Sequence, residues 1–134
     1  MRTKLAALAL SLLLAPVAGA AVGIKATLKA PAANPGIMVK WWYTIKVTNL
    51  KGKPVNARLT AHVIDPFGGV HPMGYGPTEP PVPIKNRLIR GGFRDFLEFP
   101  PESRGFKLTL RWIVKAKIGA KTYTKVLRRM VTPG

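Results

Sequence analysis

The sequence contains no cysteine, so the chain can form neither a disulfide bond nor a thiolate metal ligand. Serine is also scarce, because after residue 20 it occurs only at Ser103, in the turn-like stretch Pro-Glu-Ser-Arg-Gly. That context lacks the Gly-x-Ser-x-Gly pattern of a nucleophilic serine. Asp95 and Glu98 lie three apart on a predicted strand, hence on opposite faces, and cannot form a local acid–base pair. We therefore expect a protein that is not an enzyme and uses no cofactor.

Acidic residues are few as well: the chain has 5 Asp and Glu against 22 Lys and Arg, a formal net charge of +17. A field of this sign attracts polyanions such as cell-surface polymers, phosphorylated head groups or nucleic acid. A charge excess of the same size is also found on well-solvated surfaces that merely keep a protein in solution. Charge by itself therefore selects no partner.

Residues 1–20 have the pattern of a secretory signal peptide. A basic start at Arg2 and Lys4 precedes an apolar run from residue 5 to 14, and Ala18-Gly19-Ala20 forms a small-residue cleavage site. The run is too short for the roughly 20 apolar residues that a membrane helix needs. We expect export, a single mature domain of residues 21–134 in the cell envelope or outside the cell, and no membrane span. Losing Arg2 and Lys4 lowers the formal charge from +17 to +15.

The mature part alternates apolar and polar residues with the period of two that β-strands show. Two stretches alternate most clearly, residues 40–49 and 106–117, and shorter ones occupy 23–30, 55–64, 87–89, 93–99 and 121–131. Residues 65–83 are so rich in Pro and Gly that they predict a long loop crossing between sheets. The pattern predicts an all-β fold, an immunoglobulin-like antiparallel β-sandwich of about seven strands, with a small barrel as the alternative. Residues 40–49 and 55–64 are expected to form one hairpin, and 106–117 and 121–131 another.

Residues 41–49, the turn Gly52-Lys53-Pro54-Val55 and the strand 106–114 with Trp112 resemble the immunoglobulin-like or fibronectin-type sandwiches of secreted bacterial proteins. The stretch 93–100 and the double Trp are similar to small exported proteins of unknown function from high-GC Gram-positive bacteria. The resemblance implies an exported sandwich without implying an activity. It departs from the antibody branch, since the disulfide between the sheets has no cysteines to form it.

The first site hypothesis is a basic strand face that binds an anionic cell-envelope polymer. Trp42 would stack on sugars or bases while neighbouring cations neutralise phosphate groups. The alternative is that strand-edge lysines only discourage aggregation and that the Pro-rich loop covers Trp42. The candidate residues are Trp42, Lys46, Lys107, Arg111, Lys115, Lys117, Lys121, Lys125, Arg128 and Arg129.

The second hypothesis is a copper site of His62, His71 and Met73, since imidazole and thioether ligands suit copper. Two histidines and one methionine without cysteine fall short of an electron-transfer copper site, and all three also fit ordinary strand and loop positions. A third hypothesis is an interaction module that contacts an envelope protein through residues 65–83, because loops on rigid scaffolds carry function. The expected domain is a monomer with no specific nucleic-acid partner.

Overall fold

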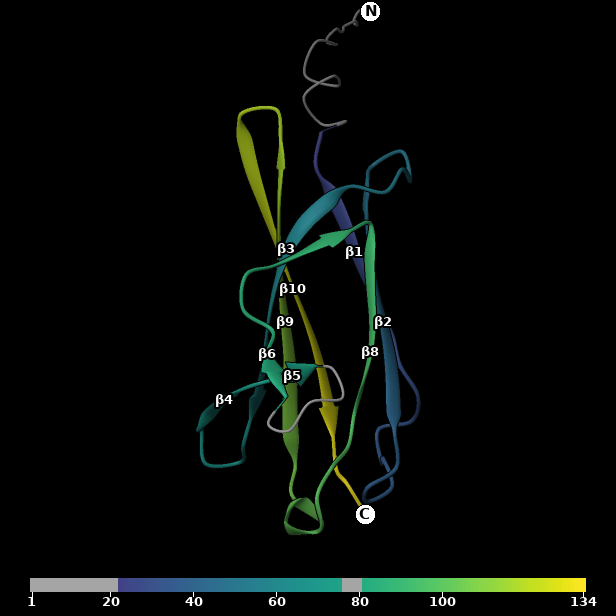
Figure 1. The fold of residues 1–134 in the computed structure, drawn as a ribbon, viewed down its shortest axis with the longest axis vertical. Coiled ribbons are helices and arrows are strands. Elements are labelled where there is room, and N and C mark those ends of the chain that lie inside the picture. Colours follow the sequence, from purple (N-terminus) through teal and green to yellow (C-terminus); the bar gives the residue numbers. More distant parts are fainter. Residues whose placement is uncertain (1–21, 76–80) are drawn as a thin grey trace, which may run out of the picture.

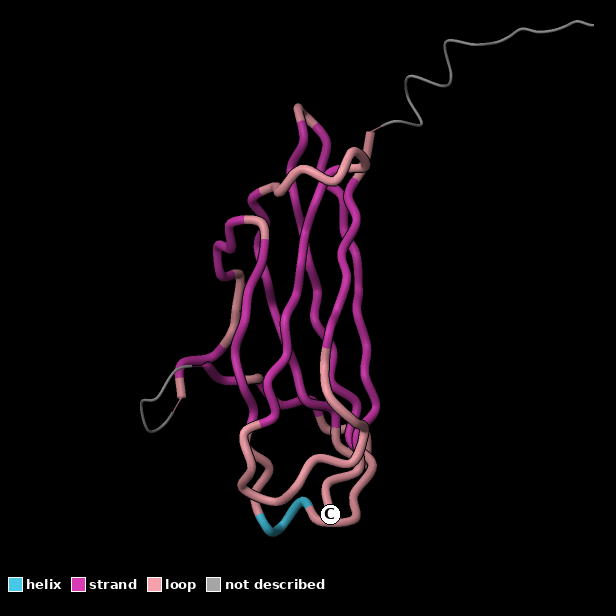
Figure 2. The backbone as a smooth tube through the Cα atoms, turned by 90° about the vertical axis from the view of Figure 1, so that its right-hand side faces the viewer, coloured by secondary structure: helices cyan, strands magenta, loops and turns pink. Residues whose placement is uncertain are grey.

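A computed structural model describes residues 22–75 and 81–134, and its regular structure is almost entirely β-strand. The long strands run along the long axis of the molecule, and the 3-10 turn η2 (Pro101–Ser103) lies at the end near the C-terminus (Figure 2). Figure 1 shows their arrangement. In chain order they are β1 (Ile24–Lys29), β2 (Trp41–Asn49), β3 (Asn56–Ile64), β4 (Val70–Pro72), β5 (Gly74–Tyr75), β6 (Val82–Pro83), β7 (Arg87–Arg90), β8 (Gly92–Leu97), β9 (Leu108–Ile118) and β10 (Lys121–Val131).

One sheet has three antiparallel strands in the order β1-β2-β8. The central strand β2 buries Trp41, Tyr43, Ile45 and Val47, while the side chains between them point outward. Alternation along a strand sends successive side chains to opposite faces, so one face of this sheet is apolar and the other is polar. The predicted alternation of residues 41–48 is confirmed.

The second sheet has the order β10-β9-β3, with β4 and β7 pairing with different parts of β3. All of these pairings are antiparallel. Strands β9 and β10 form a long hairpin, as the sequence predicted, and a small separate sheet pairs β5 with β6. Two antiparallel sheets that enclose one apolar interior form a sandwich, so the predicted all-β sandwich is confirmed.

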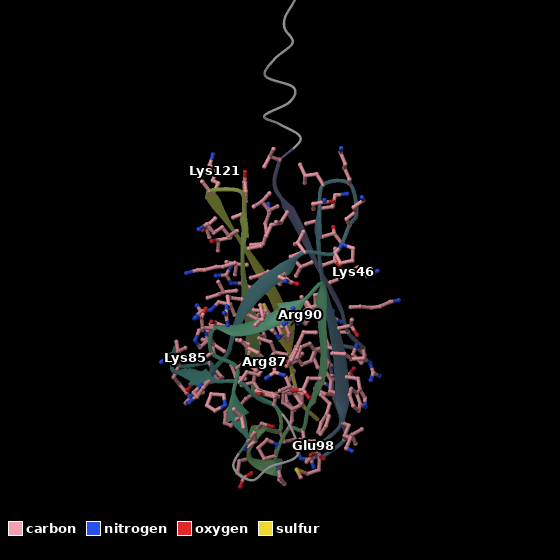
Figure 3. The ribbon with its side chains drawn as sticks, turned by 45° about the horizontal axis from the view of Figure 1, so that its top comes forward. Lys46, Lys85, Arg87, Arg90, Glu98 and Lys121 are labelled. Atoms are coloured by element: carbon pink, nitrogen blue, oxygen red, sulfur yellow. The ribbon has the colours of Figure 1, made fainter. Side chains whose placement is uncertain are left out.

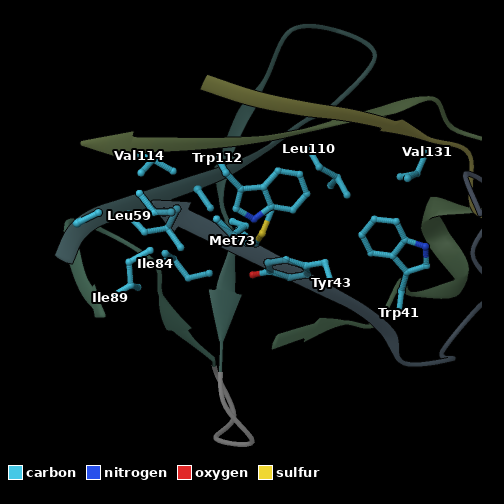
Figure 4. Close-up of a cluster of buried hydrophobic side chains, with 14 of the residues drawn as sticks. Trp41, Tyr43, Leu59, Met73, Ile84, Ile89, Leu110, Trp112, Val114 and Val131 are labelled. Atoms are coloured by element: carbon cyan, nitrogen blue, oxygen red, sulfur yellow. The ribbon is translucent and has the colours of Figure 1, made fainter. Parts of the chain in front are cut away.

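The core lies between the inner faces of the two sheets. Trp112 from β9, Tyr43 from β2 and Met73 lie together at its centre (Figure 4), and the Tyr43 and Trp112 ring centres are 5.0 Å apart. Full burial of a large apolar side chain contributes roughly 1.5–3 kcal/mol to folding. A continuous apolar interior of this kind is what holds together a fold that has no disulfide.

The predicted hairpin of residues 40–49 and 55–64 is wrong. Strands β2 and β3 belong to different sheets, and only an isolated bridge between Thr48 and Pro54 joins their ends. Pro54 has no backbone N–H to continue a ladder, and the turn carries the chain across the sandwich instead. Sequence neighbours can pair within a sheet or cross to the other one, and the alternation pattern is the same in both cases.

The chain crosses back between β7 and β8 at Gly91, not along residues 65–83 as predicted. Gly91 donates its N–H to the Val55 carbonyl (3.0 Å) and accepts a hydrogen bond from the Val47 N–H (2.9 Å), so it links the two sheets. Its φ is +78°, and a Cβ atom at this position would lie 2.6 Å from the Pro54 Cβ. Both features explain why glycine stands here.

The described part of residues 65–83 folds back along β3 and contributes short strands, so the expectation of a plain loop is corrected. Met73, at its centre, is 1% exposed and donates its backbone N–H to the Ala61 carbonyl (3.0 Å). Phe106, the first residue of the predicted strand 106–117, is 44% exposed because β9 begins only at Leu108. The predicted signal peptide, residues 1–20, lies outside the described residues.

Candidate anion-binding face

The outward side of the second sheet carries a set of basic residues brought together by long-range strand pairing. Alternation along β3, β7, β9 and β10 points these side chains away from the core. We call this set the cationic face; its members are Arg58 on β3, Arg90 on β7, Arg111, Lys115 and Lys117 on β9, and Arg128 on β10.

Like charges lie directly opposite one another on this face. Arg58 is the cross-strand partner of Lys115, and Arg111 is the cross-strand partner of Arg128. Directly opposed residues have Cβ atoms about 4.5–5.5 Å apart, and opposed like charges destabilise a sheet. Lys117, by contrast, faces Thr122. The two opposed pairs therefore create a local excess of positive charge at a cost in stability.

His62 of β3 lies opposite Arg111 on the same outward side as the cationic face. The Arg111 guanidinium donates to His62 Nδ1 over 3.0 Å, because arginine has no acceptor. Burial, and then the charge of Arg111, lower the pKa of His62 below its ordinary value. A neutral imidazole at physiological pH is the form that can accept this hydrogen bond.

No carboxylate offsets these charges among the described residues of the outward side. Besides the cations, the outward positions of the sheet carry threonine, asparagine, histidine and apolar residues, and Asp95 of the other sheet is buried. Within residues 22–75 and 81–134, the ion pair that lies within 4 Å is His71 with Asp65, at 2.8 Å. The face thus presents guanidinium and ammonium groups to solvent without acidic partners.

The ten predicted site residues are divided among several surfaces, and the predicted single row is not formed. Four of them, Arg111, Lys115, Lys117 and Arg128, belong to the cationic face. Three others, Lys121, Lys125 and Arg129, occupy the alternate positions of β10 and point to its other side. There the Arg129 guanidinium donates to the Pro31 carbonyl and lies 6.0 Å from the Trp41 ring centre. Lys107 is exposed just before β9.

Trp42 and Lys46 lie on the outer side of the opposite sheet. Figure 3 shows Lys46 projecting from β2 away from the second sheet. Trp42 is 39% exposed, so its ring is partly open to solvent. The Arg94 guanidinium lies 4.1 Å from the Trp42 ring centre, and the Phe96 ring centre is 5.0 Å from it. Trp42 therefore cannot anchor a ligand that is bound on the cationic face.

The three residues of the copper hypothesis are not brought together. His62 points outward and bonds Arg111, whereas His71 pairs across the strands with Val63, on the other side of β3, and bonds Asp65. Met73 is buried in the core. In the described part of the chain, no cluster of three or more His, Cys, Asp or Glu side chains is placed to hold a metal ion.

Two members of the cationic face, Arg58 and Arg90, escaped the sequence interpretation. Strand β3 pairs with β7 and with β9 across long sequence separations, so no local pattern places Arg58 opposite Lys115 or Arg90 opposite Asn56. Arg58 and His62 are four residues apart on the alternating stretch 55–64, so they share one face of that strand. That spacing could have identified Arg58 as an outward residue, but only knowledge that the strand pairs with residues 108–118 would have placed it opposite Lys115.

Comparison with known proteins shows a likeness of fold alone. No protein-family model matches the chain, and no curated protein matches its sequence. A solved structure of a DUF4785 family protein from Legionella pneumophila is similar, with a TM-score of 0.54 and 15% sequence identity over 82% of this chain. The match covers 28% of that protein, so this chain spans little more than a quarter of its length. None of the helices in the described residues has the length and apolar character to cross a membrane.

Proposed function

We propose that this protein is an exported, non-enzymatic binding module that holds an anionic polymer of the cell envelope or extracellular space against its cationic face. The observation that carries the proposal is the presence of two pairs of directly opposed like charges, Arg58 with Lys115 and Arg111 with Arg128. Such pairs cost stability, and a polymer of closely spaced negative charges would relieve the repulsion. Export rests on the predicted signal peptide, and an immunoglobulin-like architecture is the fold we infer for the module.

The flat shape of a sheet face suits a chain-like ligand better than a compact one. The cationic groups extend across four strands, so a flexible polymer can contact several of them at once. Binding of this type is dominated by release of counterions and falls steeply with salt. A role in binding rather than catalysis agrees with Ser103, whose hydroxyl donates to the Pro100 carbonyl (2.6 Å) within a turn.

Linear polyphosphate is a suitable probe because it presents the anionic chemistry without sugars or bases. Six phosphate contacts, each contributing about 0.7 to the slope, predict a plot of log K against log salt concentration with a slope of about −4. The double variant Arg58→Gln, Lys115→Gln should lose about 1.4 of that slope, because two contacts are removed.

The matched control is Lys25→Gln, Lys46→Gln, which removes the same charge from the outer side of the opposite sheet. The control should retain nearly the full slope. If both double variants lose affinity and slope equally, net charge rather than the cationic face is responsible, and the proposal is wrong.

A further inference from the structure

A concave feature lies at the end of the sandwich where η2 connects β8 to β9. It is a cavity of about 510 Å³ whose apolar walls include Val63 of β3, Leu97 of β8, Leu108 of β9, and Phe99 from the connection after β8. Small-molecule sites typically occupy about 300–1,000 Å³ and are lined mainly by apolar side chains. The cavity therefore has the size and wall chemistry of a site for a small organic molecule.

The rim of this cavity is acidic in a strongly basic protein. Three of the chain's five Asp and Glu residues, Asp65, Glu98 and Glu102, line the cavity, and no Lys or Arg of the described residues does. Figure 3 shows Glu98 at the end of the molecule opposite Lys121. The sign of the local charge is thus the reverse of the sign over the rest of the chain.

The three carboxylates differ in their hydrogen-bond partners. Asp65 accepts hydrogen bonds from the Phe67 and Gly69 N–H groups (2.9 and 2.8 Å) and from His71 (2.8 Å). The hydrogen bond from His71, followed by that from Gly69, lowers the Asp65 pKa. Glu98 and Glu102 are exposed, and no described residue forms a hydrogen bond or ion pair with either. These two carboxylates are free to meet a charge on a ligand.

We propose that this cavity binds a small organic cation, an ammonium or amidinium group carried on an aryl or alkyl body. The apolar body would occupy the space between Val63, Leu97 and Leu108, and the cationic group would lie at the rim against Glu98 and Glu102. Charge complementarity selects the sign of the ligand, and the apolar walls favour a carbon body over a bare metal ion. The inference is independent of the cationic face, which would take ligands of the opposite charge.

The test compares three probes with the same phenylpropyl body: 3-phenylpropylammonium, 4-phenylbutanoate and 3-phenylpropan-1-ol. Binding is measured by titration calorimetry of the purified protein at about 0.15 M salt. At this salt concentration the Debye length is about 8 Å, so the positive charges elsewhere on the protein are largely screened. We expect the ammonium to bind about tenfold more tightly than the carboxylate, a difference of about 1.4 kcal/mol, with the alcohol in between. Amide chemical shifts should change around Val63, Leu97 and Leu108.

The double variant Glu98→Gln, Glu102→Gln should bring the three affinities within about twofold of one another, whereas Glu98→Asp, Glu102→Asp retains the preference for the cation. Both glutamates are exposed, so neither variant removes a buried contact. Equal binding of the ammonium and the carboxylate by the unmodified protein, or shift changes confined to other parts of the chain, would overturn the proposal. Binding of hexalysine without binding of the small ammonium would overturn it in favour of a basic protein partner.

Discussion

Replacing Lys115 by Gln should stabilise the folded protein at low salt, because Lys115 lies directly opposite Arg58 on the cationic face. The charged ends of two such side chains can spread to about 6–8 Å, where Coulomb repulsion in a water-like medium is about 0.5–0.7 kcal/mol. At about 0.02 M salt the Debye length is roughly 20 Å, so most of this repulsion remains. We therefore expect a gain of about 0.5 kcal/mol, equivalent to roughly 2 °C in Tm.

The gain should disappear at about 0.5 M salt, where the Debye length falls to roughly 4 Å. Urea unfolding at the two salt concentrations, followed by tryptophan fluorescence, measures both values. Arg128→Gln, which removes the partner of Arg111, should behave in the same way. Lys117→Gln is the matched control, because Lys117 faces Thr122 and should gain less. Destabilisation by Lys115→Gln, or a gain that high salt leaves intact, would refute the argument that opposed like charges strain this sheet.

Two further predictions concern the core strand β2. Trp41 is 3% exposed and Trp42 is 39% exposed, so Trp41→Ala should lower the free energy of unfolding by about 3–5 kcal/mol. Trp42→Ala should lower it by only about 1 kcal/mol, through loss of the contacts with Arg94 and Phe96; equal losses in urea unfolding would contradict this assignment. Burial raises the Tyr43 pKa above its ordinary value of 10.0, so above about pH 10 the unfolded state loses the phenol proton first and stability falls by up to about 1.4 kcal/mol per pH unit. Tyr43→Phe should remove this contribution to the fall in the free energy of unfolding between about pH 9 and 11.5. An unchanged pH slope of the free energy of unfolding in the variant would show that other groups cause the fall.

The strands were predictable because their alternation is a local property of the chain. Residues 41–48 and 108–116 alternate buried and outward positions as the sequence indicated, since a period of two sends successive side chains to opposite faces. The β9–β10 hairpin was also predictable, because a short turn around Gly119 leaves neighbouring antiparallel strands little choice of partner.

Pairing between distant strands was not predictable from such local signals. The turn before β3 has the composition of a hairpin turn, yet β3 pairs with β9 in the other sheet. Passing from one sheet to the other is favourable because it buries the inner faces of both sheets. Met73 shows the same effect within a Pro- and Gly-rich stretch: it is buried because the fold brings it against the core, although its neighbours in sequence resemble a loop.

The sequence by itself determined the positive charge, the lack of disulfides and the all-β alternation, because composition and a period of two need no tertiary contact to be recognised. Only the tertiary structure decided which cations share a face and which carboxylates share a cavity. Arg58 meets Lys115 through the pairing of β3 with β9, whereas Glu98 joins Asp65 at one cavity because the ends of β8 and β3, in different sheets, lie close together. Both candidate sites depend on contacts between distant segments, which burial of a common core selects.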